Sequence, residues 1–484
     1  MSRIVVGPFN RVEGDLELSL EVEADRVVSA RVTTPLYRGF EQILVGRPVD
    51  DALVVAPRIC GICSVSQSLA AAAAIAAFAG ASPAPNGALA TALAHAAENL
   101  ADHLSHFYLF FMPDFARAQY DREPWWPETA ERFTAVKGSA SAEMLPLRAR
   151  LLEVMGLVAG KWPHSLAFRP GGTTRALDLG AKTRLRAILA DLRAFAERVI
   201  FDAPLEVFAA LDDVAALDAH AAERRGDLAR FLRLATALDL GRLGPGPGTV
   251  MSFGAYPATG PAGAPLFPAG LFETGSGAST PFRPERIVED PSRAWIAGDA
   301  GPPARAETRP DIDRPDAYTW ARAPRYDGRT AEVGAVARQL VAGHPLIRAL
   351  VARDGGTSVT SRIVARLLEV ALVLPAMEAW VGRLRPGEPF CADGGEPTDG
   401  SGVGLVEAAR GGLAHWMTVR GGRIVRYQIV APTTWNFSPR DGAGVPGPLE
   451  RALEATSLGG LGARAAAVQH VVRSFDPCMV CTAH

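Results

Sequence analysis

The chain has 484 residues, of which 48% are hydrophobic and 21% are charged, so wholesale disorder is excluded and a large core is possible. Its 50 Lys and Arg residues nearly balance 52 Asp and Glu residues, for a net charge of -2, and nothing indicates a nucleic-acid partner. The longest small apolar run, residues 69–79, is too short to cross a bilayer, and no signal peptide is visible. We expect a cytoplasmic protein without direct membrane insertion.

The first half of the chain predicts strands followed by helices. Residues 16–34 alternate polar and apolar side chains between Gly14 and Pro35, which is typical of strands. An alanine-rich helix is expected from about residue 63 to Pro83, and a second from about 88 to 111. Further helices are predicted over four ranges: 142–160, 179–220, 222–238 and 331–382.

The second half is less regular. Residues 240–330 are dense in Gly and Pro, but interleaved aromatic and aliphatic residues favour ordered loops over a disordered linker. Residues 402–431 predict strands, with a hairpin turn at Gly421–Gly422. The expected fold class is α+β and helix-dominated, with small sheets near both termini. We expect one domain, 1–484, comprising four parts: a strand region (1–60), a helical core (61–240), ordered loops (241–330), and helices, a hairpin and a C-terminal motif (331–484).

Four of the five cysteines form two C-x-x-C pairs at opposite ends of the chain: Cys60 with Cys63, and Cys478 with Cys481. This spacing in a long chain favours metal or redox chemistry over a disulfide framework. Converging thiolates suit zinc, an iron–sulfur cluster or another thiophilic metal, and spacing alone leaves these open. The first pair leads into a predicted helix whose N–H groups can stabilise anionic sulfur. Cys391 has no partner and is interpreted as incidental.

The two cysteine motifs, RICGIC and DPCMVCTAH, resemble those of the large subunit of nickel–iron hydrogenases, and the resemblance extends over essentially the whole chain. Supporting segments occur in the same order: 11–14, 37–41, 102–108, 160–164, 171–173, 323–326, 407–411 and 431–436. The resemblance implies long central helices around a buried bimetallic site. It implies an enzyme that splits H2 into protons and electrons.

The resemblance assigns ligands to this bimetallic centre. It implies that Cys60 and Cys478 bind nickel terminally, while Cys63 and Cys481 bridge nickel to an iron that carries carbon monoxide and cyanide. Glu13 resembles the first proton acceptor, a task for which a carboxyl suits if burial tunes its pKa. Without the resemblance, Glu13 would be interpreted as a surface turn residue.

Further residues resemble the wall of the metal centre and the ligands of a second metal site. Arg410 resembles a guanidinium over the metals, oriented by Asp102, and Thr433 resembles a hydroxyl that bonds cyanide. Ala409 departs from the proline usual before the arginine. Glu41 and His484 resemble magnesium ligands, although a terminal histidine can also be frayed. His103 and His106 are interpreted as core residues rather than a metal pair. The list of candidate site residues is therefore Glu13, Glu41, Cys60, Ile62, Cys63, Gln67, Asp102, Phe110, Arg410, Thr433, Cys478, Cys481 and His484.

Three of these residues predict a subgroup. Gln67 stands where most catalytic members carry a histidine, and RICGICSVSQ resembles the hydrogen-sensing, regulatory subgroup. Ile62 and Phe110 match larger side chains that narrow the gas path in that subgroup, although ordinary core packing also explains them. A sensing role predicts low turnover, a partner small subunit with iron–sulfur clusters, a sensor histidine kinase and maturation proteins.

Two alternatives stay open at this stage. The first is an uptake hydrogenase that turns over rapidly in energy metabolism. The second belongs to another class, a non-catalytic scaffold with a structural zinc ion in the four-cysteine site. The quinone-oxidoreductase subunit that shares this ancestry lacks the four cysteines, which counts against it.

Overall fold

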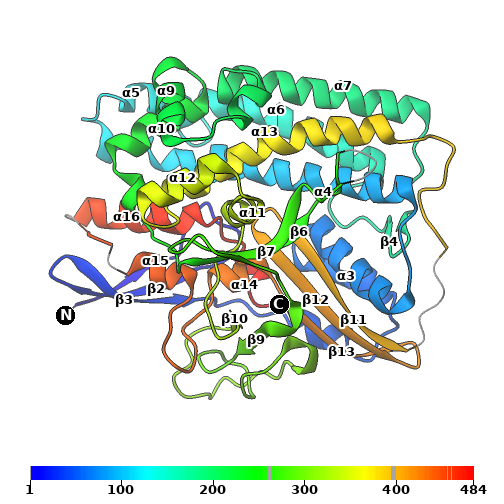
Figure 1. Cartoon of the computed structure of the whole chain (residues 1–484). Coiled ribbons are helices and arrows are strands. Elements are labelled where there is room, and N and C mark those ends of the chain that lie inside the picture. Colours follow the sequence, from blue (N-terminus) through cyan, green and yellow to red (C-terminus); the bar gives the residue numbers. More distant parts are fainter. Residues whose placement is uncertain (1, 260–262, 394–398, 455, 459–460) are drawn as a thin grey trace.

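Long helices cover one side of the molecule, and short antiparallel sheets form the other (Figure 1). The computed structural model describes residues 2–259, 263–393, 399–454, 456–458 and 461–484. This arrangement confirms the predicted helix-dominated α+β class. Among the described helices, none has the length and apolar character that crossing a membrane requires.

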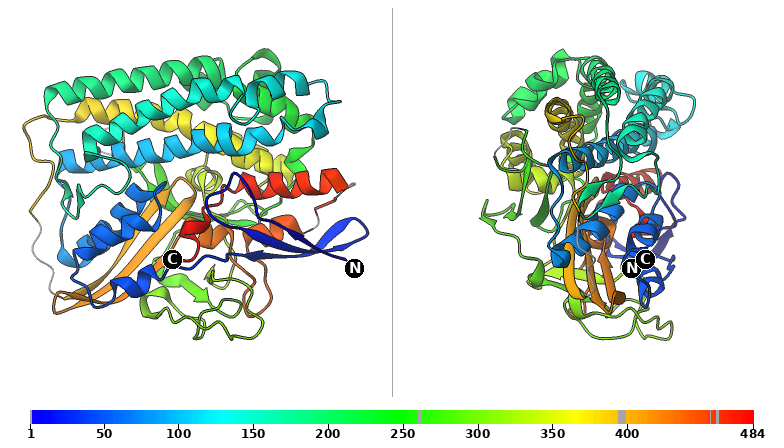
Figure 2. Two further views of the ribbon diagram at one scale, coloured as in Figure 1. Left: turned by 180° about the vertical axis from the view of Figure 1, so that it is seen from behind. Right: turned by 90° about the vertical axis from the view of Figure 1, so that its right-hand side faces the viewer.

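Four long helices run side by side through the helical layer (Figures 1 and 2). They are α4 (Pro85–Ser105), α6 (Ser139–Ala159), α7 (Leu179–Phe195) and α13 (Val359–Arg383). Helix α4 is buried on nearly all faces, because small alanines let its neighbours approach closely. Helix α13 begins at Ser358, whose hydroxyl accepts the N–H of Ser361 in a capping box.

The remaining α-helices are shorter. They are α1 (Phe40–Leu44), α2 (Asp51–Val55), α3 (Ser64–Ala79), α5 (Trp126–Phe133), α8 (Leu205–Ala209), α9 (Val214–Glu223), α10 (Asp227–Ala237), α11 (Ala335–Ala342), α12 (Pro345–Asp354), α14 (Pro432–Asn436), α15 (Pro448–Leu453) and α16 (Leu461–Ser474). One π-helical turn, His106–Phe111, extends α4, and another, Ala196–Phe201, extends α7.

Two of the helix predictions are wrong, because each predicted single helix is divided into several shorter helices. The 179–220 helix ends before Asp202, which has a left-handed conformation. The short helix α8 follows Pro204, and α9 starts after the Asp213 cap. The 331–382 helix is three helices, interrupted by His344–Pro345 and by Gly355, which is left-handed. The first four residues of that range are not helical.

Among the described residues, three sheets have three strands each and two have two, and all neighbouring strands in them are antiparallel. They comprise β1 (Ser2–Val6), β2 (Glu17–Glu23) and β3 (Arg26–Thr33); β4 (Phe168–Arg169) and β5 (Gly172–Thr173); β6 (Thr249–Ala255), β7 (Phe267–Glu273) and β8 (Ser279–Thr280); β9 (Ile287–Asp290) and β10 (Ala323–Tyr326); and β11 (Gly400–Ala408), β12 (Gly411–Arg420) and β13 (Arg423–Val430). The predicted turn at Gly421–Gly422 is confirmed, and both glycines have positive φ.

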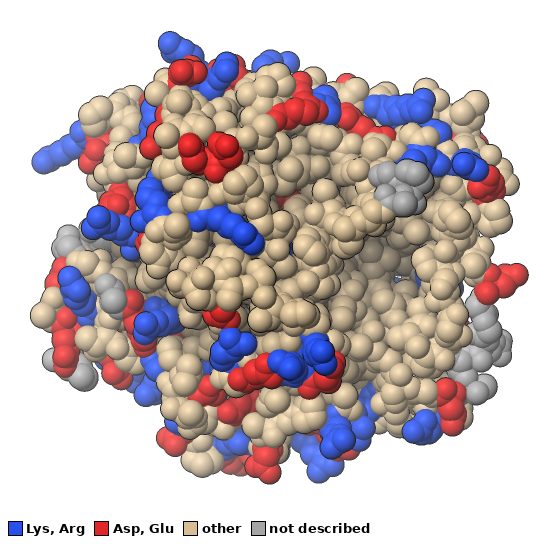
Figure 3. All heavy atoms as spheres, in the orientation of Figure 1, with Lys and Arg blue, Asp and Glu red and all other residues tan. Residues whose placement is uncertain are grey.

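The face of the molecule in Figure 3 has charged side chains of both signs mixed around its edge, while its centre is mostly uncharged. The predicted loop region, 240–330, is ordered over its described residues, as expected. It nevertheless contains β6 to β10, which were not predicted as strands.

Helix α3 lies directly on strand β11, because two glycines remove the side chains that would separate them. A Cβ added at Gly402 would stand 2.2 Å from the carbonyl oxygen of Ala74, and one at Gly404 would stand 1.9 Å from that of Ala70. This close packing fixes the helix that begins immediately after Cys63.

Substituting Gly404→Ala is therefore expected to destabilise the protein by about 1–3 kcal/mol, because the added methyl group must displace backbone. The measurement is the midpoint of thermal unfolding. Gly275→Ala is the matched control, since a Cβ there meets no atom within 4 Å. Equal midpoints for the two variants would contradict the close-packing argument.

Candidate metal centre

The two cysteine pairs, whose corresponding members are 418 residues apart in the sequence, meet in one buried cluster of sulfur atoms. The Sγ of Cys60 lies 3.5 Å from that of Cys478, and the Sγ of Cys63 lies 3.3 Å from that of Cys481. The Sγ atoms of Cys478 and Cys481 are 3.1 Å apart, and all four lie within 4.8 Å of one another. None of the four forms a disulfide bond, and of these four only Cys63 is partly exposed. The sequence prediction that the two motifs converge is confirmed.

Backbone contacts hold the two motifs together. The N–H of Met479 donates to the carbonyl of Glu13 over 2.7 Å, so the N-terminal segment runs beside Cys478 as a short parallel bridge. The N–H of Cys478 donates to the hydroxyl of Thr433 over 3.2 Å. Glu13 and Thr433 thus both lie beside the C-terminal pair.

Arg38 joins the two motifs from a position that sequence reasoning did not single out. Its guanidinium donates to the carbonyl of Ile59, immediately before Cys60, and over 2.6 Å to that of Val480, immediately before Cys481. The sequence feature that could have indicated this role is that Arg38 belongs to segment 37–41, one of the segments that carry the family resemblance. A partly buried, permanent positive charge at this junction also balances thiolate charge.

Glu98 fixes the start of α3 and was likewise missed. Its buried carboxylate accepts the N–H groups of Val65 and Ser66 over 2.8 and 2.9 Å, and the indole N–H of Trp162 over 3.1 Å. Burial raises the pKa of Glu98 to about 7, although these N–H groups lower it. Because α3 begins right after Cys63, this contact orients the first cysteine pair.

Arg410 lies between two buried carboxylates beside the sulfurs. Its guanidinium atoms are 2.7 Å from Asp102 and 3.0 Å from Asp476, and its Nε donates to the carbonyl of Asp476 over 2.8 Å. Burial lowers the pKa of Arg410, but the charges of Asp102, Asp476 and the nearby thiolates outweigh burial and raise it well above its usual range. The predicted pairing of Asp102 with Arg410 is present, whereas Asp476 was not predicted to take part.

A second buried arginine shapes the turn that carries Arg410. Arg338 donates to the carbonyls of Ala408 and Ala409 over 3.0 and 3.1 Å, and it pairs with Glu369 and Glu407 over 2.9 and 2.7 Å. Arg338 lies in helix α11, and no motif in the sequence around it predicted a role at this site. This network fixes the turn in which alanine replaces the usual proline.

The two residues predicted to bind magnesium, Glu41 and His484, lie near each other. The Nε2 of His484 lies 3.8 Å from Glu41 and 2.8 Å from the carbonyl of Ile429. Glu41 and His484 line a cavity of about 20 Å³ together with Thr308 and Arg322. His484 is buried rather than frayed, at 5% exposure.

Gln67, Ile62 and Phe110 lie on different elements, and of the three only Ile62 has a hydrogen bond to a cysteine sulfur among the described residues. Gln67 is fully buried, and its amide oxygen lies 2.8 Å from His415. Ile62 lies between the first two cysteines, with its N–H 3.3 Å from the Sγ of Cys60. Phe110 lies in the π-helical turn after α4, where its carbonyl accepts from Arg11. Ile62 and Phe110 are both partly exposed and lie on different elements.

His103 and His106 have separate partners, as their interpretation as core residues requires. His103 lies 3.4 Å from Glu369, and His106 lies 2.6 Å from the carbonyl of Arg473.

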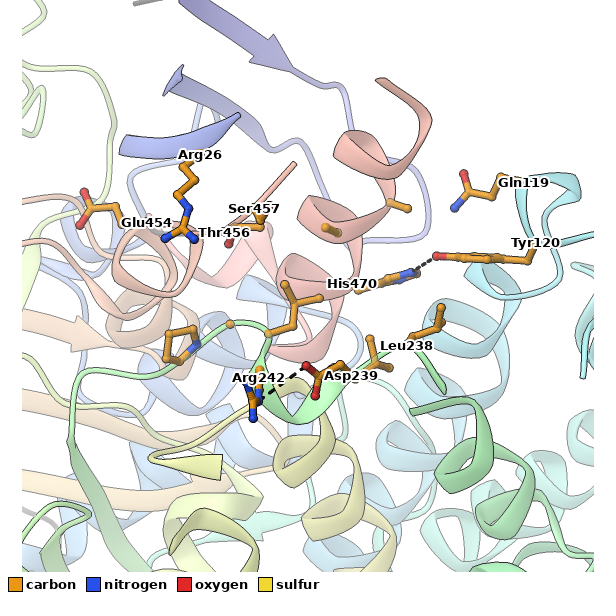
Figure 4. A pocket seen from close by; sticks show the side chains of 16 residues that line it. Arg26, Gln119, Tyr120, Leu238, Asp239, Arg242, Glu454, Thr456, Ser457 and His470 are labelled. Atoms are coloured by element: carbon orange, nitrogen blue, oxygen red, sulfur yellow. Dashed lines mark hydrogen bonds and ion pairs between the residues drawn. The ribbon is translucent and has the colours of Figure 1, made fainter. Parts of the chain in front are cut away.

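A wide pocket of about 820 Å³ lies elsewhere, where the sequence predicted no site (Figure 4). Its wall includes His470 and Tyr120, which are hydrogen-bonded over 2.7 Å, and Arg242, which pairs with Asp239. None of the four clustered cysteines lines it, so it is separate from the sulfur cluster.

Comparisons with known proteins give a consistent result. The model of the nickel-dependent hydrogenase family matches residues 38–120 and 134–484. The periplasmic [NiFeSe] hydrogenase large subunit of Desulfomicrobium baculatum is 28% identical, over 100% of this chain and 95% of that protein. The uptake hydrogenase large subunit of Azotobacter chroococcum mcd 1 is 26% identical, over 100% and 95%. A solved structure of the Dm. baculatum [NiFeSe]-hydrogenase matches with a TM-score of 0.85 and 27% identity, over 100% of both chains.

Proposed function

Since the chain belongs to the nickel-dependent hydrogenase family, as the large subunit that carries the metal centre, we propose that it is a hydrogen-sensing member of that family. The chain is an enzyme subunit that activates H2. The sensing role is supported by Gln67, a neutral amide held one helical turn beyond Cys63.

The four sulfurs fit a nickel–iron pair. They converge, they are mostly buried, and Arg38 and Arg410 supply positive charge that offsets the thiolates. When bound, the metal pair supplies an open coordination position that polarises H2 for heterolytic cleavage. Within the proposal, the iron carries carbon monoxide and cyanide, to which Arg410 and Thr433 can donate hydrogen bonds.

Protons and electrons leave by different routes in this proposal. Glu13 takes the proton, because it lies beside Cys478 and a carboxyl can accept and release protons. Burial and the charge of Cys60 raise the pKa of Glu13, whereas Arg410 lowers it. Electrons pass to iron–sulfur clusters in a small partner subunit, since the four paired cysteines of this chain are committed to the metal centre.

The proposal also includes a magnesium site, a cellular location and further partners. Glu41 and His484 would hold magnesium through a carboxylate oxygen and an imidazole nitrogen, with waters completing the shell. A cytoplasmic location, a sensor histidine kinase and maturation proteins belong to the sensing role.

Metal analysis of the purified complex with the small subunit tests the proposal. We expect one nickel per large subunit, iron in excess of nickel because the clusters of the small subunit add to the iron of the centre, and infrared bands from carbon monoxide and cyanide. Zinc in place of nickel, without those infrared bands, would instead favour the non-catalytic scaffold and overturn the proposal.

Replacing Glu13 with Gln is expected to lower H2 oxidation about 100- to 10,000-fold, because the isosteric amide cannot carry a proton. Nickel content should stay at the wild-type level, since the backbone of Glu13, not its side chain, binds Met479. The measurement is H2-dependent dye reduction by the complex. Undiminished turnover would show that protons leave by another group.

Replacing Gln67 with His tests the sensing role against the uptake alternative. A titratable ring at this position is expected to raise turnover by about tenfold, within the range reported for partners of metal ligands. Dye reduction and oxygen sensitivity are measured at equal nickel loading. If wild-type turnover already equals that of the variant, the uptake function is favoured.

A further inference from the structure

Three buried side chains form a chain of hydrogen bonds from helix α3 into the C-terminal sheet. The Oε1 of Gln67 lies 2.8 Å from the Nε2 of His415, and the Nδ1 of His415 lies 2.7 Å from the hydroxyl oxygen of Tyr427. Each residue is at most 2% exposed. The mechanism above uses neither His415 nor Tyr427.

The fold places these three residues together. Gln67 follows Cys63 by four residues, so both lie on the same face of the helix start. His415 pairs with Gly404, the strand residue against which α3 packs, and therefore faces the helix. Tyr427 pairs with Met417, two residues beyond His415, and is its diagonal neighbour on the same face.

The hydrogen bonds have one consistent direction. Burial, together with the charge of His484, lowers the pKa of His415 to about 3, so the ring is neutral near pH 7 and has one donor and one acceptor. Because an amide oxygen can only accept, the Nε2 of His415 donates to Gln67. The Nδ1 must then accept from the hydroxyl of Tyr427.

This direction leaves the amide nitrogen of Gln67 as a buried donor. Its Nε2 has no hydrogen-bond partner among the described residues. It points away from His415, because the amide oxygen occupies that side. A buried donor without a partner costs about 1–3 kcal/mol, so this position calls for an acceptor that the described residues do not supply.

We propose that His415 and Tyr427 are positioning residues of the metal centre, which hold the Gln67 amide so that its NH2 group donates to the acceptors around Cys63. This inference rests on the proposed function, because it assumes a metal-loaded centre. Tyr427 acts through His415, and His415 acts through Gln67. Neither residue touches the reacting atoms.

The test uses the holo-complex and the electron paramagnetic resonance spectrum of its nickel. Tyr427→Phe removes only the hydroxyl, and His415→Leu removes both ring nitrogens. Both should shift the nickel g values, because the amide loses its fixed orientation. His415→Gln should retain the wild-type spectrum, since its amide N–H can still donate to Gln67. Tyr108→Phe is the matched control, a buried tyrosine bonded to Asp227.

Each outcome bears on one claim. Nickel-loaded Tyr427→Phe and His415→Leu spectra that superimpose on the wild type would overturn the positioning role. The role would also be overturned if Tyr108→Phe shifted the spectrum equally, because the effect would then be a general loss of packing. Absence of nickel from the wild-type complex would contradict the proposed function itself.

Discussion

Replacing Cys478 with Ala is expected to abolish nickel binding and H2 oxidation together. Its sulfur lies 3.5 Å from that of Cys60 and 3.1 Å from that of Cys481, so the substitution removes one of the four converging sulfurs and its contact with the first motif. Even hydrogen-bonding partners of metal ligands contribute about 10- to 100-fold in metal affinity, and loss of a ligand should exceed that. The measurement is nickel and iron per chain in the purified complex.

Cys391→Ala is the matched control for this prediction. Cys391 is also a free thiol, but it is partly exposed and its Sγ lies 3.6 Å from the carbonyl of Ala392, away from the cluster. The control should keep its metals and its activity. Equal nickel content in the Cys478→Ala and Cys391→Ala proteins would refute the assignment of the cluster as the nickel site.

Replacing Arg410 with Met is expected to destabilise the protein by about 3–5 kcal/mol, the usual cost of removing one partner of a buried ion pair. The substitution leaves Asp102 and Asp476 without their shared cation in a buried position. Chemical denaturation of the complex measures the loss. H2 oxidation should fall as well, because a buried positive charge that interacts with Cys60 and Cys478 is removed.

The destabilisation should depend on pH. With Arg410 present, burial already raises the pKa of Asp102 to about 8, whereas at Asp476 burial is outweighed by the charges of Arg410 and other nearby basic groups, which hold its pKa below its usual range. Without Arg410, burial favours the neutral form of both carboxyls, so both folded-state pKa values would lie above those of the unfolded chain. The folded variant then binds more protons than the unfolded chain, and its stability deficit is largest above both pKa values and shrinks as pH falls.

Arg242→Met provides the comparison, because the Arg242–Asp239 pair is 3.7 Å apart and largely exposed. It should change stability little at any pH. A deficit in Arg410→Met that grows toward acid, or one no larger than that of Arg242→Met, would contradict the buried-pair argument.

Local signals in the sequence predicted the four clustered cysteines. They did not predict the residues that hold the cysteine motifs and the Arg410 turn in place. The four cysteines could be found because C-x-x-C spacing and motif resemblance are properties of short segments. Arg38, Glu98 and Arg338 could not, because each acts through partners far along the chain, and a lone charged residue carries no spacing signal. Their roles depend on which helices and strands become neighbours.

The errors in secondary structure have a similar origin. Helix propensity in 179–220 and 331–382 is high, but Pro204, Pro345 and the left-handed Gly355 interrupt the hydrogen-bond pattern. Proline and glycine at these positions predict helix ends more strongly than the helix propensity of the neighbouring residues predicts a continuous helix. The strands between residues 249 and 326 were not predicted for another reason, which is that they lack the alternating pattern of polar and apolar residues. Strand β6 is buried on both faces and therefore does not alternate, and β7 contains Pro268.

The contact between the sulfurs of the N-terminal and C-terminal cysteine pairs also constrains how the protein is made. Cys478 is translated 418 residues after Cys60, and at about 5–20 residues per second this interval lasts roughly 20–80 s. Throughout that time the first thiols lack their counterparts and are accessible to oxidants and to competing ions such as zinc. Faithful assembly therefore demands either shielding of the nascent N-terminal thiols or delivery of metal after translation of the C-terminal motif.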